Sequence, residues 1–151
     1  MDYSALITER DSLDSYKKII QLLIEDVDCK QVVVICSEEL LVQLIVAPMP
    51  KVLYVKKSKH IYMTLLNGLK AVSQENVLVI GKDWIQFEQI EQTKKELNEY
   101  PAIYYNDSIQ GFDTRLVMFC LQMAIEINLE IKTYANAVEA LGDTPLKYIK
   151  H

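Results

Sequence analysis

One short basic run in this sequence has the residue types to bind an anion. The run KKSKH (56–60) follows a predicted strand at 52–55 and leads into a predicted helix at 60–73. Amide groups at the start of that helix, together with the lysine side chains, could receive a phosphate group. A solvated loop would contain the same residue types, because lysines mostly lie at protein surfaces. Lys59 is therefore a candidate phosphate-binding residue, with an exposed loop as the alternative.

The turn where α/β proteins usually bind phosphate lacks the residues for it. A predicted strand at 3–8 is followed by a predicted helix from Leu13, and the first glycine of the chain is Gly68. Nucleotide-binding α/β proteins place a glycine-rich loop here, because glycine lets backbone amides close around a phosphate. The missing glycines argue against the nucleotide chemistry that such a fold commonly performs.

Nucleophilic catalysis and metal binding have no candidate set of residues either. His60 and His151 are the two histidines, and neither belongs to a recognisable serine–histidine–acid arrangement. Cys29, Cys36 and Cys120 are odd in number and contain no C-x-x-C pair, which argues against a disulfide framework or a zinc site. We therefore expect no catalytic residue, no metal site and no cofactor, with Cys36 and Cys120 in the core.

Length and charge exclude further classes of function. The chain has 151 residues and a net charge of −5, and half of its residues are apolar. Such a chain suits one domain over 1–151 with its own core. Its negative charge disfavours general binding to nucleic acid or anionic membranes, and no apolar run reaches the roughly 18–20 residues that span a bilayer. We expect a cytoplasmic protein without membrane insertion.

Predicted strands and helices alternate along the chain. The runs QVVVIC (31–36) and NVLVI (76–80) are continuous and rich in β-branched residues, which is typical of strands buried on both faces. Ser37 precedes two glutamates and is expected to cap a helix. The predicted strands are 3–8, 31–36, 52–55, 76–80, 102–105 and 146–149, and the predicted helices are 13–26, 38–46, 60–73, 86–99, 113–128 and 134–141. This alternation predicts a three-layer α/β fold, in which helices cover both faces of a mostly parallel sheet.

Four segments resemble, in order, the sugar-alcohol-phosphate cytidylyltransferases, above all the methylerythritol-phosphate cytidylyltransferases and their ribitol-phosphate relatives. They are LDSYKKIIQLLIEDVDCKQVVVICSEE, SKHIYMTLLNGLKAVSQENVLVI, YYNDSI and TYANAVEALGDTPLKYIKH. NGLKAV and NAVEALG are the most specific of these matches. The resemblance implies a shortened, Rossmann-like nucleotidyltransferase fold, related to enzymes that join CTP to a polyol phosphate with the help of Mg²⁺.

The chain departs from the family pattern where the family binds CTP and metal. The opening A-A-G-x-G-x-R-M loop has no counterpart, so Arg10 could stand in for a phosphate contact, with a solvated loop arginine as the alternative. Thr64 falls on the serine of the family's R-Q-D-S motif and could reach a base or ribose, or could be an ordinary threonine on a helix face. Asp83 is displaced from the family's metal-binding aspartate, and we expect it to cap a helix. The family's β-arm and C-terminal lysine-bearing strand are also missing, which predicts a truncated, degenerate member.

These departures predict a non-catalytic protein that acts as a protein-binding or regulatory scaffold, because the core positions stay regular while the losses fall on the family's chemistry. Two alternatives stay open. One is a protein that binds a cytidine nucleotide or polyol phosphate through Thr64 and the 56–60 turn. The other is a cytidylyltransferase completed by a partner chain. The expected partner is another protein or a second copy of the chain, with CTP or a sugar-alcohol phosphate as candidate small ligands and no nucleic acid.

Overall fold

The computed structural model describes residues 1–143 and 145–150. Its helices are α1 (Leu13–Ile24), α2 (Glu38–Leu44), α3 (Ile61–Lys70), α4 (Phe87–Leu97), α5 (Thr114–Glu126) and α6 (Tyr134–Leu141). Its strands are β1 (Tyr3–Ile7), β2 (Cys29–Cys36), β3 (Val52–Lys56), β4 (Asn76–Ile80), β5 (Ala102–Asn106), β6 (Ile109–Asp113) and β7 (Lys147–Tyr148). The predicted helices are all present, and their ends differ from the prediction by no more than three residues.

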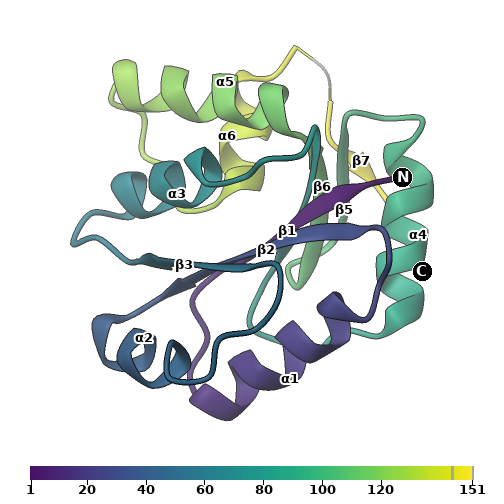
Figure 1. Cartoon of the computed structure of the whole chain (residues 1–151). Helices are drawn as coiled ribbons and strands as arrows, with labels where there is room; N and C mark the ends of the chain where they lie inside the picture. The colour runs from purple at the N-terminus through teal and green to yellow at the C-terminus, as the bar shows by residue number, and fades with distance from the viewer. Residues whose placement is uncertain (144, 151) are drawn as a thin grey trace.

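The strands form one sheet in the order β3-β2-β1-β4-β6-β5-β7 (Figure 1). Neighbouring strands run parallel, except that β6 is antiparallel to both β4 and β5. The mostly parallel sheet expected from the strand–helix alternation is thereby confirmed.

Strand β6 is absent from the sequence-based prediction, which places no strand between 105 and 113 and is wrong there. A two-residue turn joins β5 to β6, and the Asn106 side chain accepts hydrogen bonds from the amides of Ser108 and Ile109 at 2.8 and 3.1 Å. Gln110 and Gly111 read as turn residues in sequence. In the fold both are buried within the sheet, because β6 is paired on both sides.

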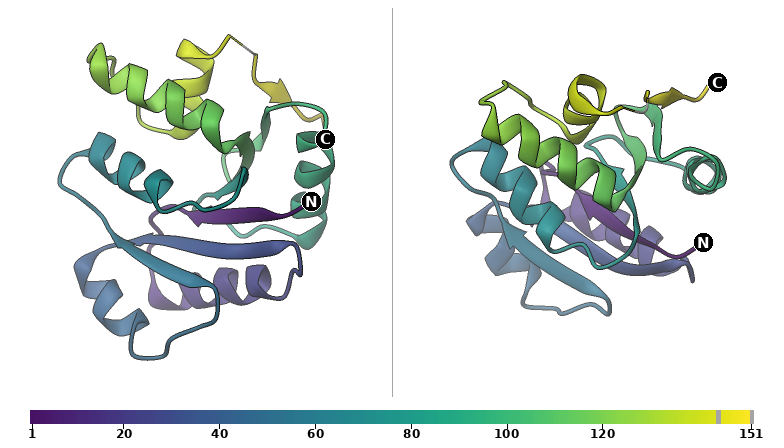
Figure 2. Two further views of the ribbon diagram at one scale, coloured as in Figure 1. Left: turned by 45° about the horizontal axis from the view of Figure 1, so that its top comes forward. Right: turned by 90° about the horizontal axis from the view of Figure 1, so that it is seen from above.

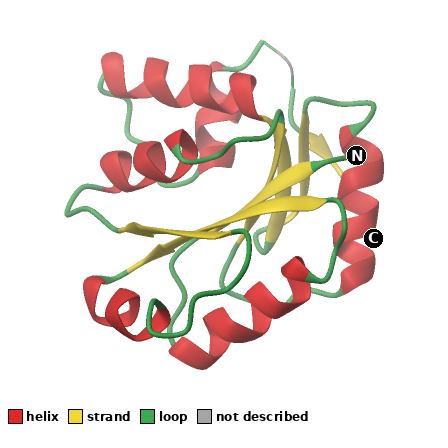
Figure 3. Ribbon diagram, viewed as in Figure 1, coloured by secondary structure: helices red, strands yellow, loops and turns green. Residues whose placement is uncertain are grey.

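Helices cover both faces of the sheet in three layers (Figures 2 and 3). Along β1, Ala5 and Ile7 pack with buried residues of α1 and α4, whereas Leu6 packs with residues of α3, α5 and α6. This alternation follows from the two-residue period of a strand. The three-layer arrangement predicted from the sequence is therefore present.

Helix caps show where local prediction succeeds and where it fails. Ser37 caps α2 as predicted, and its hydroxyl accepts a hydrogen bond from the Leu40 amide at 3.3 Å. Asp83 does not cap α4, so that prediction is wrong. Gln86 takes this position, and the Asp83 carboxylate accepts a hydrogen bond from the Ser108 hydroxyl at 3.3 Å. The connection from β4 to α4 is longer than the sequence suggests, and it carries Asp83 to the β5–β6 turn.

The two sequence motifs most specific to the resemblance meet in the fold. Gly68 of NGLKAV packs against Tyr134, two residues before NAVEALG, and a Cβ at position 68 would lie 3.0 Å from the tyrosine oxygen. It would also lie 2.7 Å from Cδ1 of Ile35 on the sheet. The buried Tyr134 hydroxyl donates to the Leu65 carbonyl at 2.6 Å. Glycine at position 68 therefore lets α3, α6 and β2 approach closely.

Two further expectations concern cysteines and membranes. Cys29, Cys36 and Cys120 are free and buried, and burial raises the pKa of all three thiols, that of Cys36 to about 11. Cys36 and Cys120 are thus core residues, as expected. Within the described residues, no helix has the length and apolar character required to cross a membrane.

Candidate functional site

A cleft of about 490 Å³ opens at the carboxyl ends of the parallel strands. Its walls come from the segments that follow β1, β3 and β4, from the β5–β6 turn, and from the starts of α3 and α6. The strand order changes direction between β1 and β4. Ligands of open α/β sheets bind at such switch points, outside the carboxyl ends of the strands. Position alone therefore makes this cleft the candidate site.

Positive charge dominates the cleft, although the chain as a whole has a net charge of −5. Four lysines line it, and its acidic residues are Glu9 and Asp107. Lys57 pairs with Glu9 at 2.8 Å, and Lys82 pairs with Asp11 at 3.6 Å. The other two lysines are Lys59 and Lys132, which are exposed and have no ion-pair partner among the described residues. These two ammonium groups are thus available to an anionic ligand.

The inner wall of the cleft is apolar. Ile35 and Val79 come from the sheet, and Leu65 and Tyr134 come from the helices that cover it. An apolar wall with a few charged groups at the rim is typical of small-molecule sites. The geometry suits a ligand with a flat or apolar part and a phosphate or carboxylate group.

Thr64 and Lys59 lie together at this cleft, as the sequence-based hypothesis requires. The Thr64 hydroxyl accepts a hydrogen bond from the Ser58 amide at 2.9 Å and lies 3.2 Å from the carbonyl oxygens of Ser58 and His60. Its hydrogen-bonding capacity is therefore used by the turn that carries Lys59. Thr64 acts here as a residue that shapes the turn, while Lys59 reaches solvent.

Arg10 lies elsewhere, and the alternative of a solvated loop arginine is wrong. The residue is 4% exposed. Its Nε donates to the Ser15 hydroxyl at 2.6 Å, and its guanidinium group also donates to the Gly81 carbonyl. Burial lowers the pKa of this arginine. Arg10 lines a second, more open depression of about 560 Å³ beside Trp84, and it joins the start of α1 to the end of β4.

The turn between β1 and α1 uses its amides inside the protein. The Thr8 amide donates to the Ile80 carbonyl at 2.9 Å, and the Arg10 amide donates to the Tyr16 hydroxyl at 2.9 Å. Tyr16 in turn donates to the Ile35 carbonyl at 2.7 Å, and burial raises its pKa to about 12. Two amides of this turn are therefore bonded within the protein, one to a backbone carbonyl and one to a side chain, and neither is directed at a ligand.

The residues that directly follow β4 do not supply the carboxylate that would hold the Mg²⁺ ion implied by the resemblance. Oxygen ligands suit this ion, but Gly81 and Lys82 directly follow β4, where the family's metal-binding aspartate would lie. Nearby, the Asp83 carboxylate accepts a hydrogen bond from the Ser108 hydroxyl. The Asp107 carboxylate accepts one from the Tyr104 hydroxyl, and this bond raises the pKa of Tyr104 to about 12. Among the described residues, no cluster of three or more histidine, cysteine, aspartate or glutamate side chains could hold a metal ion.

Sequence reasoning missed Lys132 as a site residue. It lies directly before Thr133, whose hydroxyl caps α6 by accepting from the Asn136 amide at 3.1 Å. No motif surrounds Lys132, and its proximity to Lys59 arises from the packing of α6 beside α3. The one sequence feature that could have indicated Lys132 is its position next to a helix cap, since ligands of α/β proteins bind at the sheet edge where such helices begin.

Comparisons with known proteins give the fold an identity. No family model matches the sequence, and a search of curated proteins gives no match. Among solved structures, the 4-diphosphocytidyl-2C-methyl-D-erythritol synthase from Anaerococcus prevotii matches with a TM-score of 0.80 at 14% identity, over 98% of this chain and 86% of that one. The 2-C-methyl-D-erythritol 4-phosphate cytidylyltransferase from Thermus thermophilus gives 0.73 at 16% identity, over 99% and 89%. The bifunctional IspDF from Campylobacter jejuni gives 0.72 at 13% identity, over 100% and 50%.

These likenesses concern the arrangement of the chain, since the identities are low. Over nearly its whole described length, the chain has the fold of the methylerythritol-phosphate cytidylyltransferases.

Proposed function

We propose that this protein is a non-catalytic relative of the cytidylyltransferases whose cleft binds a phosphorylated small molecule. The observation that carries the proposal is the position of Lys59 and Lys132, which have no ion-pair partner in the described part of the chain and lie beside an apolar wall at the switch point of the sheet. The names of the similar structures include a cytidyl group and 2-C-methyl-D-erythritol 4-phosphate. A cytidine nucleotide or a polyol phosphate is therefore the ligand class to test.

The β1–α1 turn supports a binding role without nucleotidyl transfer. Such transfer depends on charge neutralisation by backbone amides, cationic side chains and metal. Here the amides of Thr8 and Arg10 donate within the protein, and the Arg10 side chain is held by Ser15 and Gly81. Loss of one such stabilising group costs about 10²–10³ in rate.

A second role, as a protein-binding scaffold, is supported by a different surface. The outer face of α5 exposes Phe119 to 58% in a helix with few charges. Exposed aromatic residues on a weakly charged surface are typical of protein interfaces. The two roles use separate parts of the molecule, and one protein could have both.

The test of the ligand-binding role is a thermal-shift titration with CTP, CDP, 2-C-methyl-D-erythritol 4-phosphate and ribitol phosphate, each with and without Mg²⁺. A ligand at 100 times its dissociation constant adds about 2.7 kcal/mol to the free energy of unfolding, which raises the Tm by several degrees in a domain of this size. We expect such a rise with at least one ligand, and we expect it not to depend on Mg²⁺.

Turnover assays complete this experiment. Formation of pyrophosphate from CTP and a polyol phosphate by the purified chain would contradict the non-catalytic proposal. Turnover that appears only after a second protein is added would instead support an enzyme completed by a partner chain. No shift with any ligand at saturating concentration would contradict the ligand-binding role.

A further inference from the structure

Helix α5 presents an apolar outer face. It is the uppermost helix in Figure 1, above α3 and α6. Phe119 is 58% exposed, and Leu116, Met118 and Met123 are partly exposed on either side of it. By contrast, α4 exposes Phe87 at its first position, and its other exposed positions are polar: Glu88, Glu91, Gln92 and Lys95. Of the two helices, α5 therefore has the less polar exposed face, which water solvates less well.

The two charged residues of α5 lie at its ends and oppose the helix dipole. Arg115 is in the first turn and Glu126 in the last, although a helix favours acidic residues at its start and basic residues at its end. Both side chains are exposed, and neither has an ion-pair or hydrogen-bond partner among the described residues. Nothing within the described fold accounts for these two charges.

The exposed residues of α5 have a spacing that is the same when the helix is read in the opposite direction. Arg115, Phe119, Gln122 and Glu126 are exposed and separated by four, three and four positions, so they share one stripe of the helix. Against an antiparallel copy of α5, Arg115 would face Glu126 at each end, and Phe119 would face Gln122. Met118 and Met123 lie on opposite sides of this stripe and would border the contact. Such a match is the property of an interface with two-fold symmetry.

We propose that a second copy of this chain docks on α5, with the two helices antiparallel about a two-fold axis. The axis passes close to the middle of the helix, and an Arg115–Glu126 ion pair closes each end of the contact. Ile127, which is 54% exposed just after the helix, extends the apolar area. This proposal rests on the scaffold role above, for which it names the partner, and it is independent of the cleft.

Charge complementarity favours a second copy over an unrelated partner. Each copy supplies one cation and one anion at the positions where the other needs them, whereas an unrelated protein would have to match this spacing by its own sequence. Each ion pair lies at the rim of the contact, so it sets orientation more than affinity. Salt should weaken the association, because the charges stay near solvent.

The experiment measures association of the full chain by sedimentation equilibrium and by light scattering, from micromolar to several hundred micromolar protein. The variants are R115E, E126R, the double reversal R115E/E126R, and F119D. Lys95→Glu on α4 is the matched control, since it reverses an exposed charge on another face. Circular dichroism checks that each variant keeps its fold, which we expect because the changed residues are exposed.

We expect the wild type and K95E to dimerise. Each single reversal should raise the dissociation constant by at least about tenfold, because it places like charges opposite one another at both ends of the contact. The double reversal should restore dimerisation to near the wild-type level, and F119D should abolish it.

Three results would overturn the proposal. They are a wild type that stays monomeric over the whole range, a dimer that R115E and F119D leave unchanged, and a folded double variant that fails to recover. A monomeric wild type would remove the dimer while leaving ligand binding at the cleft untouched, because the thermal-shift titration tests that site separately.

Discussion

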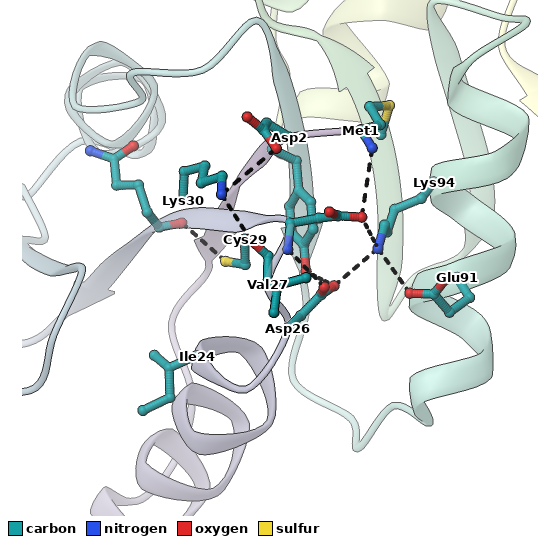
Figure 4. Close-up of polar contacts among 12 residues, drawn as sticks. Met1, Asp2, Ile24, Asp26, Val27, Cys29, Lys30, Glu91 and Lys94 are labelled. Atoms are coloured by element: carbon teal, nitrogen blue, oxygen red, sulfur yellow. Dashed lines mark hydrogen bonds and ion pairs between the residues drawn. The ribbon is translucent and has the colours of Figure 1, made fainter.

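At the amino edge of the sheet, Lys94 contacts three carboxylates, whereas at the carboxyl edge Lys59 and Lys132 contact none among the described residues. The Lys94 side chain is 8% exposed, and its Nζ lies 2.8 Å from Glu91, 2.9 Å from Asp28 and 3.2 Å from Asp26 (Figure 4). The cleft lysines are exposed instead. Lysine thus forms ion pairs within the protein at the amino edge, whereas two lysines at the carboxyl edge are exposed to solvent.

The burial of Lys94 and the exposure of the cleft lysines explain the different roles of the two edges. Desolvation lowers the pKa of Lys94, but hydrogen bonds to Glu91, Asp28 and Asp26 outweigh it and raise the pKa overall. Tyr3 donates to Asp26 at 2.8 Å and closes the cluster from β1. Within the described residues, no buried side-chain nitrogen or oxygen lacks a hydrogen-bond partner. The amino edge therefore contributes to stability, whereas Lys59 and Lys132 at the carboxyl edge stay exposed to solvent.

Lys94→Met should cause the largest loss in the free energy of unfolding. A small loss would contradict the difference drawn between the two edges. The substitution leaves Asp26, whose side chain is 5% exposed, without its cation. Removing one partner of a buried ion pair costs about 3–5 kcal/mol, and we expect a loss near 3 kcal/mol because Asp28 and Glu91 stay partly solvated. Chemical denaturation measures the loss. The neighbouring exposed Lys95→Met is the control, and equal losses in both variants would contradict the account.

Arg10→Met should have the next largest effect. It removes the hydrogen bonds to Ser15 and Gly81 from a buried position, which should cost about 2 kcal/mol. Ligand affinity, measured at a temperature where the variant is folded, should stay within about twofold. Unchanged stability together with abolished binding would instead identify Arg10 as a phosphate-binding residue.

Acid and alkali should affect the amino edge in a defined direction. A hydrogen bond from Lys94 lowers the pKa of Asp28, so its stabilising contribution is present above the unfolded pKa of about 3.9 and is lost as the pH falls through the lower folded value. Lys94 has a raised pKa, so its contribution is complete below about pH 10.4 and is lost at higher pH. Unfolding free energies at several pH values should therefore show a smaller difference between wild type and K94M below pH 4 than at pH 7. A difference that is constant with pH would contradict this assignment.

The double variant K59E/K132E should have the smallest effect on stability. Both side chains are exposed and unpaired among the described residues, so the free energy of unfolding should change by no more than about 0.5 kcal/mol. Denaturation under the same conditions as for K94M makes the comparison direct. A loss above 1 kcal/mol would mean that these lysines are part of the fold, as Lys94 is.

Sequence reasoning predicted the features that depend on local pattern. The continuous run at 31–36 gave β2, and the apolar positions at spacings of three and four gave α1. β6 was missed because Gly111 and Gln110 read as a turn until the neighbouring strands pair with them. Long-range pairing of this kind leaves little trace in a short segment.

The polar clusters were harder to predict because their members come from separate segments. Lys94 lies four residues after Ile90 and three before Leu97, all on the buried side of α4. That spacing was a signal that this lysine points inward. The partner residues, Asp26 and Asp28, lie more than sixty positions away in the chain. Lys132 carried no such signal, since its role depends on where α6 packs.

The central claim is that the open lysines at the carboxyl edge bind a phosphorylated ligand without metal. Isothermal titration in the presence of a chelator tests it most directly, with CTP, CDP and the two polyol phosphates added to wild type, K59E/K132E and the control K95E. The account predicts that wild type and K95E bind at least one ligand equally well, and that K59E/K132E binds it at least about tenfold more weakly. Binding that K59E/K132E retains at the wild-type affinity, or no binding by any of the four ligands while the chelator is present, would contradict it.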